Sequence, residues 1–287
     1  MAAIYKKEVR GFLTSMIGYV FMAFLLVVTG IYFTYYNLSV GWPKFAYVLS
    51  CILFVFMIAV PILTMRVLSE EQKQKTDQML LTAPISVTEI VVGKFLALAT
   101  IFLIPMLIMA LYPLILSQFG TVYFGETYTA MFGFFLMGCS FLAIGLFVSS
   151  VTESQVIAAV LTFLVLFVSY VISGISSLLP ETAFGSFVII LVLIALAAVL
   201  VYNTVKSTLV SLLCLIAGAA AAVAVYVVNS TLYEGLIQDV LSVLDLSNHF
   251  SNFYSGIFDV NGIVYYLSVI GLFLYLTVET IQKRRWS

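Results

Sequence analysis

Long apolar stretches dominate this sequence and restrict what it can fold into. Eight of them follow one another along the chain, each near the roughly 20 residues that a helix needs to cross about 30 Å of hydrocarbon. Lipid offers no partners for backbone N–H and C=O groups, so a spanning segment must bond them internally, as a helix does. We therefore predict an all-α, polytopic membrane protein with spans at 17–36, 45–64, 95–116, 130–149, 156–176, 184–202, 209–228 and 262–281.

One pair of these stretches has a second interpretation. Residues 184–202 and 209–228 are joined by a short turn, and such a hairpin can also be re-entrant, which would leave six spans instead of eight. Lys206 at the tip of the hairpin favours crossing. Both numbers are even, so both predict that the two termini lie on the same side.

Basic residues fix the orientation of the spans. Eleven of the 12 Lys and Arg residues fall on the side of the termini, and Lys44 alone falls on the other side. Because cytoplasmic loops are enriched in Lys and Arg, both termini are predicted to be cytoplasmic. Charged residues make up only 9% of the chain and its net charge is −1, which excludes a soluble domain and a nucleic-acid-binding role.

The segment 1–16 has the pattern of an interfacial helix that leads into the first span. Apolar residues, among them Ile4, Val9 and Phe12, recur at helical spacing, and Lys6, Lys7 and Arg10 occupy the other positions. Such a helix lies on the lipid headgroups with its basic face toward them.

Most of the predicted cytoplasmic material lies in one loop, residues 65–94. It has a charged approach, a short amphipathic segment near 77–81, a break at Pro84, and Ser86 followed three residues later by Glu89. That last spacing predicts a capping box at the start of the next helix. The apolar face of the amphipathic segment can be buried on lipid headgroups or in a groove of a partner protein.

The turn between the fourth and fifth spans is the second cytoplasmic feature. Thr152, Glu153 and Ser154 make a polar tip without Lys or Arg. Thr152 or Ser154 can cap the next helix while Glu153 complements its dipole. The alternative is a second docking point for a partner.

Three segments occur in order along this chain: EEQKQKTDQMLLTAPISVTEIVVGKF, GLFVSSVTESQVIAAVLTF and the terminal LSNHFSNFYSG to KRRW region. Together they resemble the ABC type 2 transporter permeases, particularly their gliding-motility-associated branch. The predicted topology places segment 229–261 on the extracytoplasmic side. The resemblance implies one permease domain over 1–287, with 1–16 as its elbow helix, and a homodimer in the bacterial cytoplasmic membrane. It also implies that two ABC ATPase subunits dock on a coupling helix in the 65–94 loop.

The coupling residues that the resemblance implies lie in this loop and in the polar turn. The family usually has Gly before the Thr that begins the coupling helix, where this chain has Lys75. The positions carried over are Glu70, Glu71, Thr76, Asp77, Leu80, Leu81 and Pro84, with Thr152, Glu153 and Ser154 in the turn.

The chain lacks the residues that would make it an enzyme. No G-x-x-x-x-G-K-[ST] phosphate-binding loop occurs, so ATP and Mg are expected in the partner ATPase. No metal or cofactor site is predicted, because His249 stands without a second His or a Cys beside it. We predict an export permease that is not itself an enzyme. The alternative is an ion-coupled secondary transporter or a scaffold subunit of a membrane complex. The sequence leaves open whether an accessory protein binds on the outer side.

Overall fold

Helices account for the regular structure in the described part of the chain, which comprises residues 1–76, 86–180, 182–205, 212, 215–217, 219–220, 223, 226 and 233–286 of a computed structural model. Six helices within these residues are long and apolar enough to cross a membrane. They match the predicted first five spans and the last, which confirms the all-α polytopic fold. The six are Met16–Ser39, Phe45–Lys73, Val87–Leu116, Phe124–Val151, Gln155–Leu178 and Val260–Arg284.

The predicted hairpin is covered only in its first half. Helix α10 (Ala183–Val205) contains the expected stretch 184–202. Most of its expected partner, 209–228, lies outside the described residues, as does Lys206. The choice between six and eight spans therefore stays a prediction.

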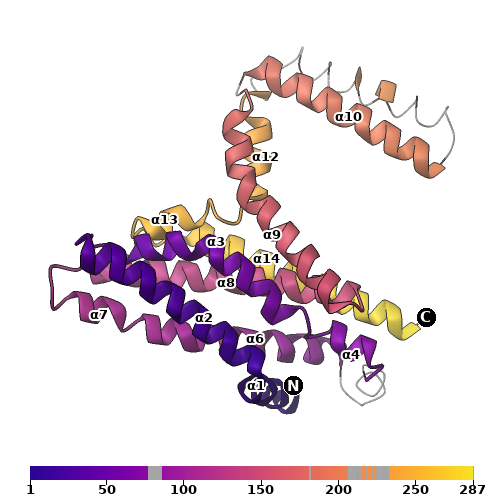
Figure 1. The fold of residues 1–287 in the computed structure, drawn as a ribbon. Coiled ribbons are helices and arrows are strands. Elements are labelled where there is room, and N and C mark those ends of the chain that lie inside the picture. Colours follow the sequence, from indigo (N-terminus) through magenta and orange to yellow (C-terminus); the bar gives the residue numbers. More distant parts are fainter. Residues whose placement is uncertain are drawn as a thin grey trace. The chain divides into compact units, whose positions relative to one another are not determined.

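The contacts divide the chain into two compact units. The first comprises Met1–Val168 and His249–Ser287 and the second Ser169–Asn248, so the boundary falls within α9 (Gln155–Leu178). In the first unit the central helix is α8 (Phe124–Val151), and 83% of its most apolar stretch is buried. Helices α3 (Phe45–Thr64), α6 (Val87–Met109) and α14 (Val260–Trp286) pack against it (Figure 1).

Glycines on α8 permit this close packing. A Cβ atom on Gly138 would collide with the ring of Phe102 on α6, and one on Gly145 would collide with Thr64 on α3. Small residues let helix backbones approach within a membrane, where van der Waals packing is a main source of helix association. The neighbours of α8 are therefore held in one register by the shape of its surface.

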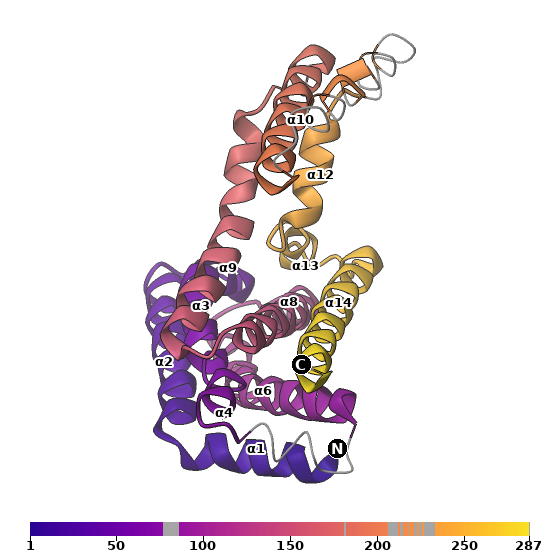
Figure 2. The ribbon, with the colours of Figure 1, turned by 90° about the vertical axis from the view of Figure 1, so that its right-hand side faces the viewer.

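Helix α1 (Ala2–Thr14) is a separate helix within the predicted N-terminal segment 1–16. It ends at Ser15, whose backbone is extended, and α2 (Met16–Tyr32) begins directly afterwards. Ile4 and Phe12 are buried on its inner side, and Lys6, Lys7 and Arg10 are exposed. It packs along α6 and lies beneath α4 (Ser69–Lys73) in the view of Figure 2.

The first and third spans change their geometry near the ends that are predicted to be outer. Helix α2 continues as a π-helix, η1 (Phe33–Ser39), and α6 is followed by the short α7 (Tyr112–Leu116). The ring of Phe33 lies 4.9 Å from that of Tyr112, measured between centroids. Aromatic clusters of this kind are typical of the membrane–water interface.

The second unit contains the end of α9, α10 and α12 (Leu236–Leu244). The hydroxyl of Ser169 donates to the carbonyl of Leu244 at 2.7 Å and accepts from the N–H of Leu246 at 3.2 Å. The amide of Gln238 donates to the carbonyl of Leu179 at 3.2 Å. These bonds fasten α12 along α9 within this unit.

Short helices also occur in the described part of the predicted extracytoplasmic segment 229–261. Helix α12 belongs to the second unit and α13 (Phe250–Tyr254) to the first. Phe253 of α13 is fully buried, and a Cβ atom on Gly133 of α8 would contact its ring. Segment 250–254 is thus part of the packed first unit.

Candidate functional site

The predicted cytoplasmic features of the first unit meet around α4. This helix follows α3 after a turn at residues 65–68 and ends just before residues 77–85, which lie outside the described residues. It contacts the C-terminal end of α8, and ion pairs reach from it to α1 and α6. The candidate site is therefore the base of the 65–94 loop.

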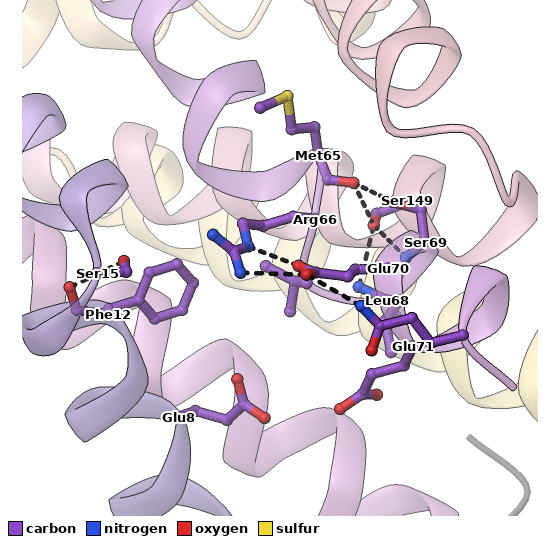
Figure 3. A network of polar contacts seen from close by, with 12 residues as sticks. Glu8, Phe12, Ser15, Met65, Arg66, Leu68, Ser69, Glu70, Glu71 and Ser149 are labelled. Carbon is purple, nitrogen blue, oxygen red and sulfur yellow. Dashed lines mark hydrogen bonds and ion pairs between the residues drawn. The ribbon is translucent and has the colours of Figure 1, made fainter. Parts of the chain in front are cut away.

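The beginning of α4 is held by a serine of α8. The Ser149 hydroxyl accepts hydrogen bonds from the N–H groups of Leu68 and Ser69, both at 3.1 Å, and donates to the carbonyl of Met65 at 3.2 Å (Figure 3). A helix start leaves N–H groups without intrahelical acceptors, and here a side chain from another helix supplies one. Ser149 and Ser69 are both fully buried.

A second contact joins α4 to the polar turn. The Gln72 side-chain amide donates to the carbonyl of Ser150 at 2.9 Å. Two residues further on, the Thr152 hydroxyl accepts from the N–H of Ser154 at 3.2 Å, and α9 begins at Gln155. The Thr152 hydroxyl thus holds the turn that precedes α9, and this turn lies beside the base of the loop.

An ion pair joins the turn before α4 to the helix itself. Arg66 donates to both carboxylate oxygens of Glu70, at 2.6 and 3.2 Å, in a two-pronged arrangement (Figure 3). The Gln74 amide donates to the same carboxylate at 3.4 Å. Planar pairing of this kind adds geometric definition as well as energy. The Glu70 carboxylate is thus bound by Arg66 and Gln74 of the same chain.

Lys94 makes the most buried charged contact of the site. Its side chain is 1% exposed, and its ammonium donates to Glu8 of α1 at 3.0 Å, to Glu71 of α4 at 2.9 Å and to the carbonyl of Val67 at 3.0 Å. Three acceptors match the three N–H groups of a lysine. Lys7 of α1 adds a longer contact of 3.9 Å to Glu71.

The burial and the partners of Lys94 go beyond the sequence expectation. The capping box at Ser86 predicts a helix that leads into the third span with Lys94 at its mouth, and α6 does begin at Val87 and enclose Lys94. What the sequence did not predict is that the Lys94 side chain is buried. Its partners Glu8 and Glu71 are far away in the sequence and were not predicted as a pair. The one available signal is the ionisable residue itself, because a buried charge requires opposite charges close by.

The end of α4 has the hydrogen bonds of a Schellman motif. The N–H of Thr76 donates to the carbonyl of Glu71 at 3.0 Å, and the N–H of Lys75 donates to that of Gln72 at 3.1 Å. Lys75 has a φ of 56°, in the left-handed region that favours glycine. This is the position where the resembled family has Gly. Lys73, Gln74, Lys75 and Thr76 are all exposed.

The far side of the loop starts as predicted. The Ser86 hydroxyl accepts from the N–H of Glu89 at 3.2 Å, and the Glu89 carboxylate accepts from the N–H of Ser86 at 3.3 Å. This is the capping box expected from the sequence. Residues 77–85 are therefore bracketed by a closed helix end at Thr76 and a capped helix start at Ser86.

An open pocket of about 410 Å³ separates α1 from α4. Its charged walls are already paired, because Arg66 binds Glu70 and Lys7 approaches Glu71. The remaining lining is small or apolar near α1. The lining residues are Lys7, Glu8, Gly11, Phe12, Ser15, Arg66, Val67, Glu70, Glu71, Gln74 and Thr76.

The structure brings together six of the ten predicted coupling residues. Glu70, Glu71 and Thr76 lie on or directly after α4, and the Gln72 contact places the turn with Thr152, Glu153 and Ser154 beside it. Glu153 is exposed. The other four lie outside the described residues, namely Asp77, Leu80, Leu81 and Pro84.

The predicted outer side of the first unit carries two charged contacts of its own. Lys44 donates to Glu126 at 2.7 Å, and this hydrogen bond and charge raise the pKa of Lys44 above its usual value. Asp259, just before α14, accepts from the Asn252 side chain at 2.8 Å and from the N–H of Asn261 at 2.9 Å, which lowers the pKa of its carboxyl.

Among the described residues, no group of three His, Cys, Asp or Glu side chains is placed to hold a metal ion. His249 instead stacks on Tyr265, with 3.9 Å between ring centroids and 4° between their planes.

The chain matches a known family over most of its length. Residues 10–214 match the family described as ABC-2 family transporter protein. No curated protein matches it.

Proposed function

Since this chain belongs to the ABC-2 transporter family and is the membrane-spanning permease subunit of an ATP-binding cassette transporter, we propose that a separate ATPase subunit docks on its 65–94 loop and drives export. The chain is a multi-pass membrane protein and a transport subunit. We assign it to the gliding-motility-associated branch and to the bacterial cytoplasmic membrane.

One observation carries this proposal, the double anchoring of α4. Its start is bonded to Ser149 and its middle to the carbonyl of Ser150, both on α8. Its exposed end leads directly into residues 77–85. A partner that moves this segment would therefore act on the central helix of the first unit.

The partner is expected to supply the ATP chemistry. The chain has no phosphate-binding loop, so ATP and Mg would be held by the docking subunit. Two permease copies over two ATPases would give the twofold symmetry that is commonest among oligomers. Closure of the ATPases on ATP would shift the loops, and the spans would follow through α8.

The distribution of charged residues within the described spans is consistent with ATP hydrolysis in a separate subunit. Ion-coupled transporters are expected to hold charged or broken-helix sites near the bilayer midplane. In the described spans the buried charge is Lys94, which lies near the cytoplasmic start of α6 and is fully paired. This arrangement supports an energy source outside the chain over an ion gradient.

Co-purification tests the proposal. Tagged permease is expected to bring down a subunit with a phosphate-binding loop and vanadate-sensitive ATPase activity. A variant with residues 77–85 replaced by Gly and Ser should lose that subunit and still unfold at the wild-type temperature. The same replacement at the outer residues 117–122 is the control. Full ATPase association of the 77–85 variant would contradict the docking assignment.

A further inference from the structure

We propose that Lys94 is a positioning residue that closes the base of the coupling loop and joins the interfacial helix α1 to it. The inference rests on the proposed function, because it concerns how movement of that loop reaches the rest of the permease.

The geometry places Lys94 between the two stems of the loop. Glu71 belongs to α4, the stem that enters residues 77–85, and Lys94 belongs to α6, the stem that leaves them. The 2.9 Å contact between them closes the loop at its base. The bond to the carbonyl of Val67 ties the same ammonium to the turn before α4.

The second carboxylate extends the closure to α1. Glu8 lies 3.0 Å from the Lys94 ammonium, and the side chains of Glu8 and Glu71 are only 16% and 17% exposed. Tyr5 of α1 adds a 3.0 Å hydrogen bond to Thr100, further along α6. Ile4 packs beside Gly93, where a Cβ atom would lie 3.3 Å from the Ile4 methyl group.

A buried ion cluster is better suited to fixing register than to adding stability. The cost of desolvating charges offsets much of their attraction, whereas removal of one member leaves the others buried and unpaired. Without Lys94 the carboxylates of Glu8 and Glu71 would face each other and repel. The two stems, α4 and the start of α6, could then separate. A displacement of the loop would move α4 away from α6 and would not be passed on to α1.

The consequence is a defined path of movement. With the base closed, α4, the start of α6 and α1 move as one body when the docked ATPase displaces the loop. With the base open, the loop and α4 still respond to the ATPase while α1 no longer follows. This difference can be measured without knowledge of the transported substrate.

The experiment uses the permease with its co-purifying ATPase in nanodiscs. Hydrogen exchange is compared between the nucleotide-free complex and the complex trapped with ATP, Mg²⁺ and vanadate. In the wild type we expect exchange to change in residues 69–76 and in α1. In Lys94→Met the change in 69–76 should remain, and that in α1 should shrink at least about fivefold, the lower end of usual coupling between sites.

Two further variants separate positioning from mere folding. Lys44→Met removes an ion pair on the outer side and should leave the α1 response intact. In the triple variant Glu8→Gln, Lys94→Met, Glu71→Gln the repulsion is gone, so its melting temperature should approach that of the wild type while the α1 response stays low. A response that recovers together with the melting temperature would show a purely structural role.

The outcomes also distinguish this inference from the proposed function. If wild-type permease binds no ATPase, or if residues 69–76 do not respond to trapping, the docking proposal itself fails. If residues 69–76 respond and α1 responds equally in the wild type and in Lys94→Met, docking stands and the positioning role of Lys94 is wrong.

Discussion

Substitution of Ser149 by Ala should loosen α4 without disturbing the helix on which Ser149 lies. The change removes the acceptor for the buried N–H groups of Leu68 and Ser69. An unsatisfied buried donor costs about 1–3 kcal/mol, and loss of a helix-start cap about 0.5–2 kcal/mol. Allowing for relaxation of the short helix, we expect α4 to open more easily by about 2–3 kcal/mol.

Hydrogen exchange of the purified permease measures this directly. Because about 1.4 kcal/mol corresponds to a factor of ten, amide exchange in residues 68–72 should accelerate roughly 30- to 150-fold. Exchange in the middle of α8 should stay unchanged.

Ser140→Ala is the matched control. Ser140 is equally buried on the same helix, but its hydroxyl only donates, to the carbonyls of Leu136 and Tyr266. Its loss leaves no N–H group without an acceptor, so exchange in 68–72 should not change. The reasoning is refuted if Ser149→Ala behaves like Ser140→Ala.

Three other substitutions test separate features of the structure. Gly145→Ala should destabilise the packed bundle by about 1–3 kcal/mol through overpacking, whereas Gly271→Ala, where a Cβ meets nothing within 4 Å, should leave the melting temperature unchanged. Lys75→Gly should slow exchange at the end of α4 by relieving a left-handed backbone that costs of order 1 kcal/mol, whereas Lys73→Gly, within the helix, should accelerate it. Asp259 has a lowered pKa, so its contribution to stability is full above the usual carboxyl pKa of 3.8 and is lost as pH falls below it; Asp259→Asn should flatten the dependence of melting temperature on pH below 3.8.

Each of these has a clear contrary result. Equal melting temperatures for Gly145→Ala and Gly271→Ala would mean that α3 can move away from α8 without a loss of stability. Faster exchange in Lys75→Gly would mean that the closed end of α4 does not set its stability. If the melting temperature of Asp259→Asn fell at low pH as it does in the wild type, the Asp259 carboxylate would not contribute to the stability of the folded chain.

Local patterns in the sequence predicted local structure well. The span 45–64 coincides with α3, because Pro43 and Lys44 precede an uninterrupted apolar run and Arg66 follows it. The capping box at Ser86 depends on residues three apart, which a linear reading can identify. The predicted boundary between segment 1–16 and the span at 17–36 lies next to the observed break at Ser15.

Contacts between distant residues were beyond such patterns. Glu8 and Lys94 are 86 positions apart, and α1 carries other charges that could equally have been paired with Lys94. Ser149 stands at the end of an apolar run, where a serine can simply face water, and only the folded chain brings α4 against it. The left-handed backbone at Lys75 was detectable only through comparison with a family that has glycine there.

Docking of an ATPase on residues 77–85 is the central claim, and site-specific photo-crosslinking tests it most directly. A photoreactive amino acid at Leu80, introduced into the permease in its native membrane, should capture a subunit that carries a phosphate-binding loop. The same group at Thr121, in the outer loop, should not. Capture of that subunit from neither position, or equally from both, would contradict the account.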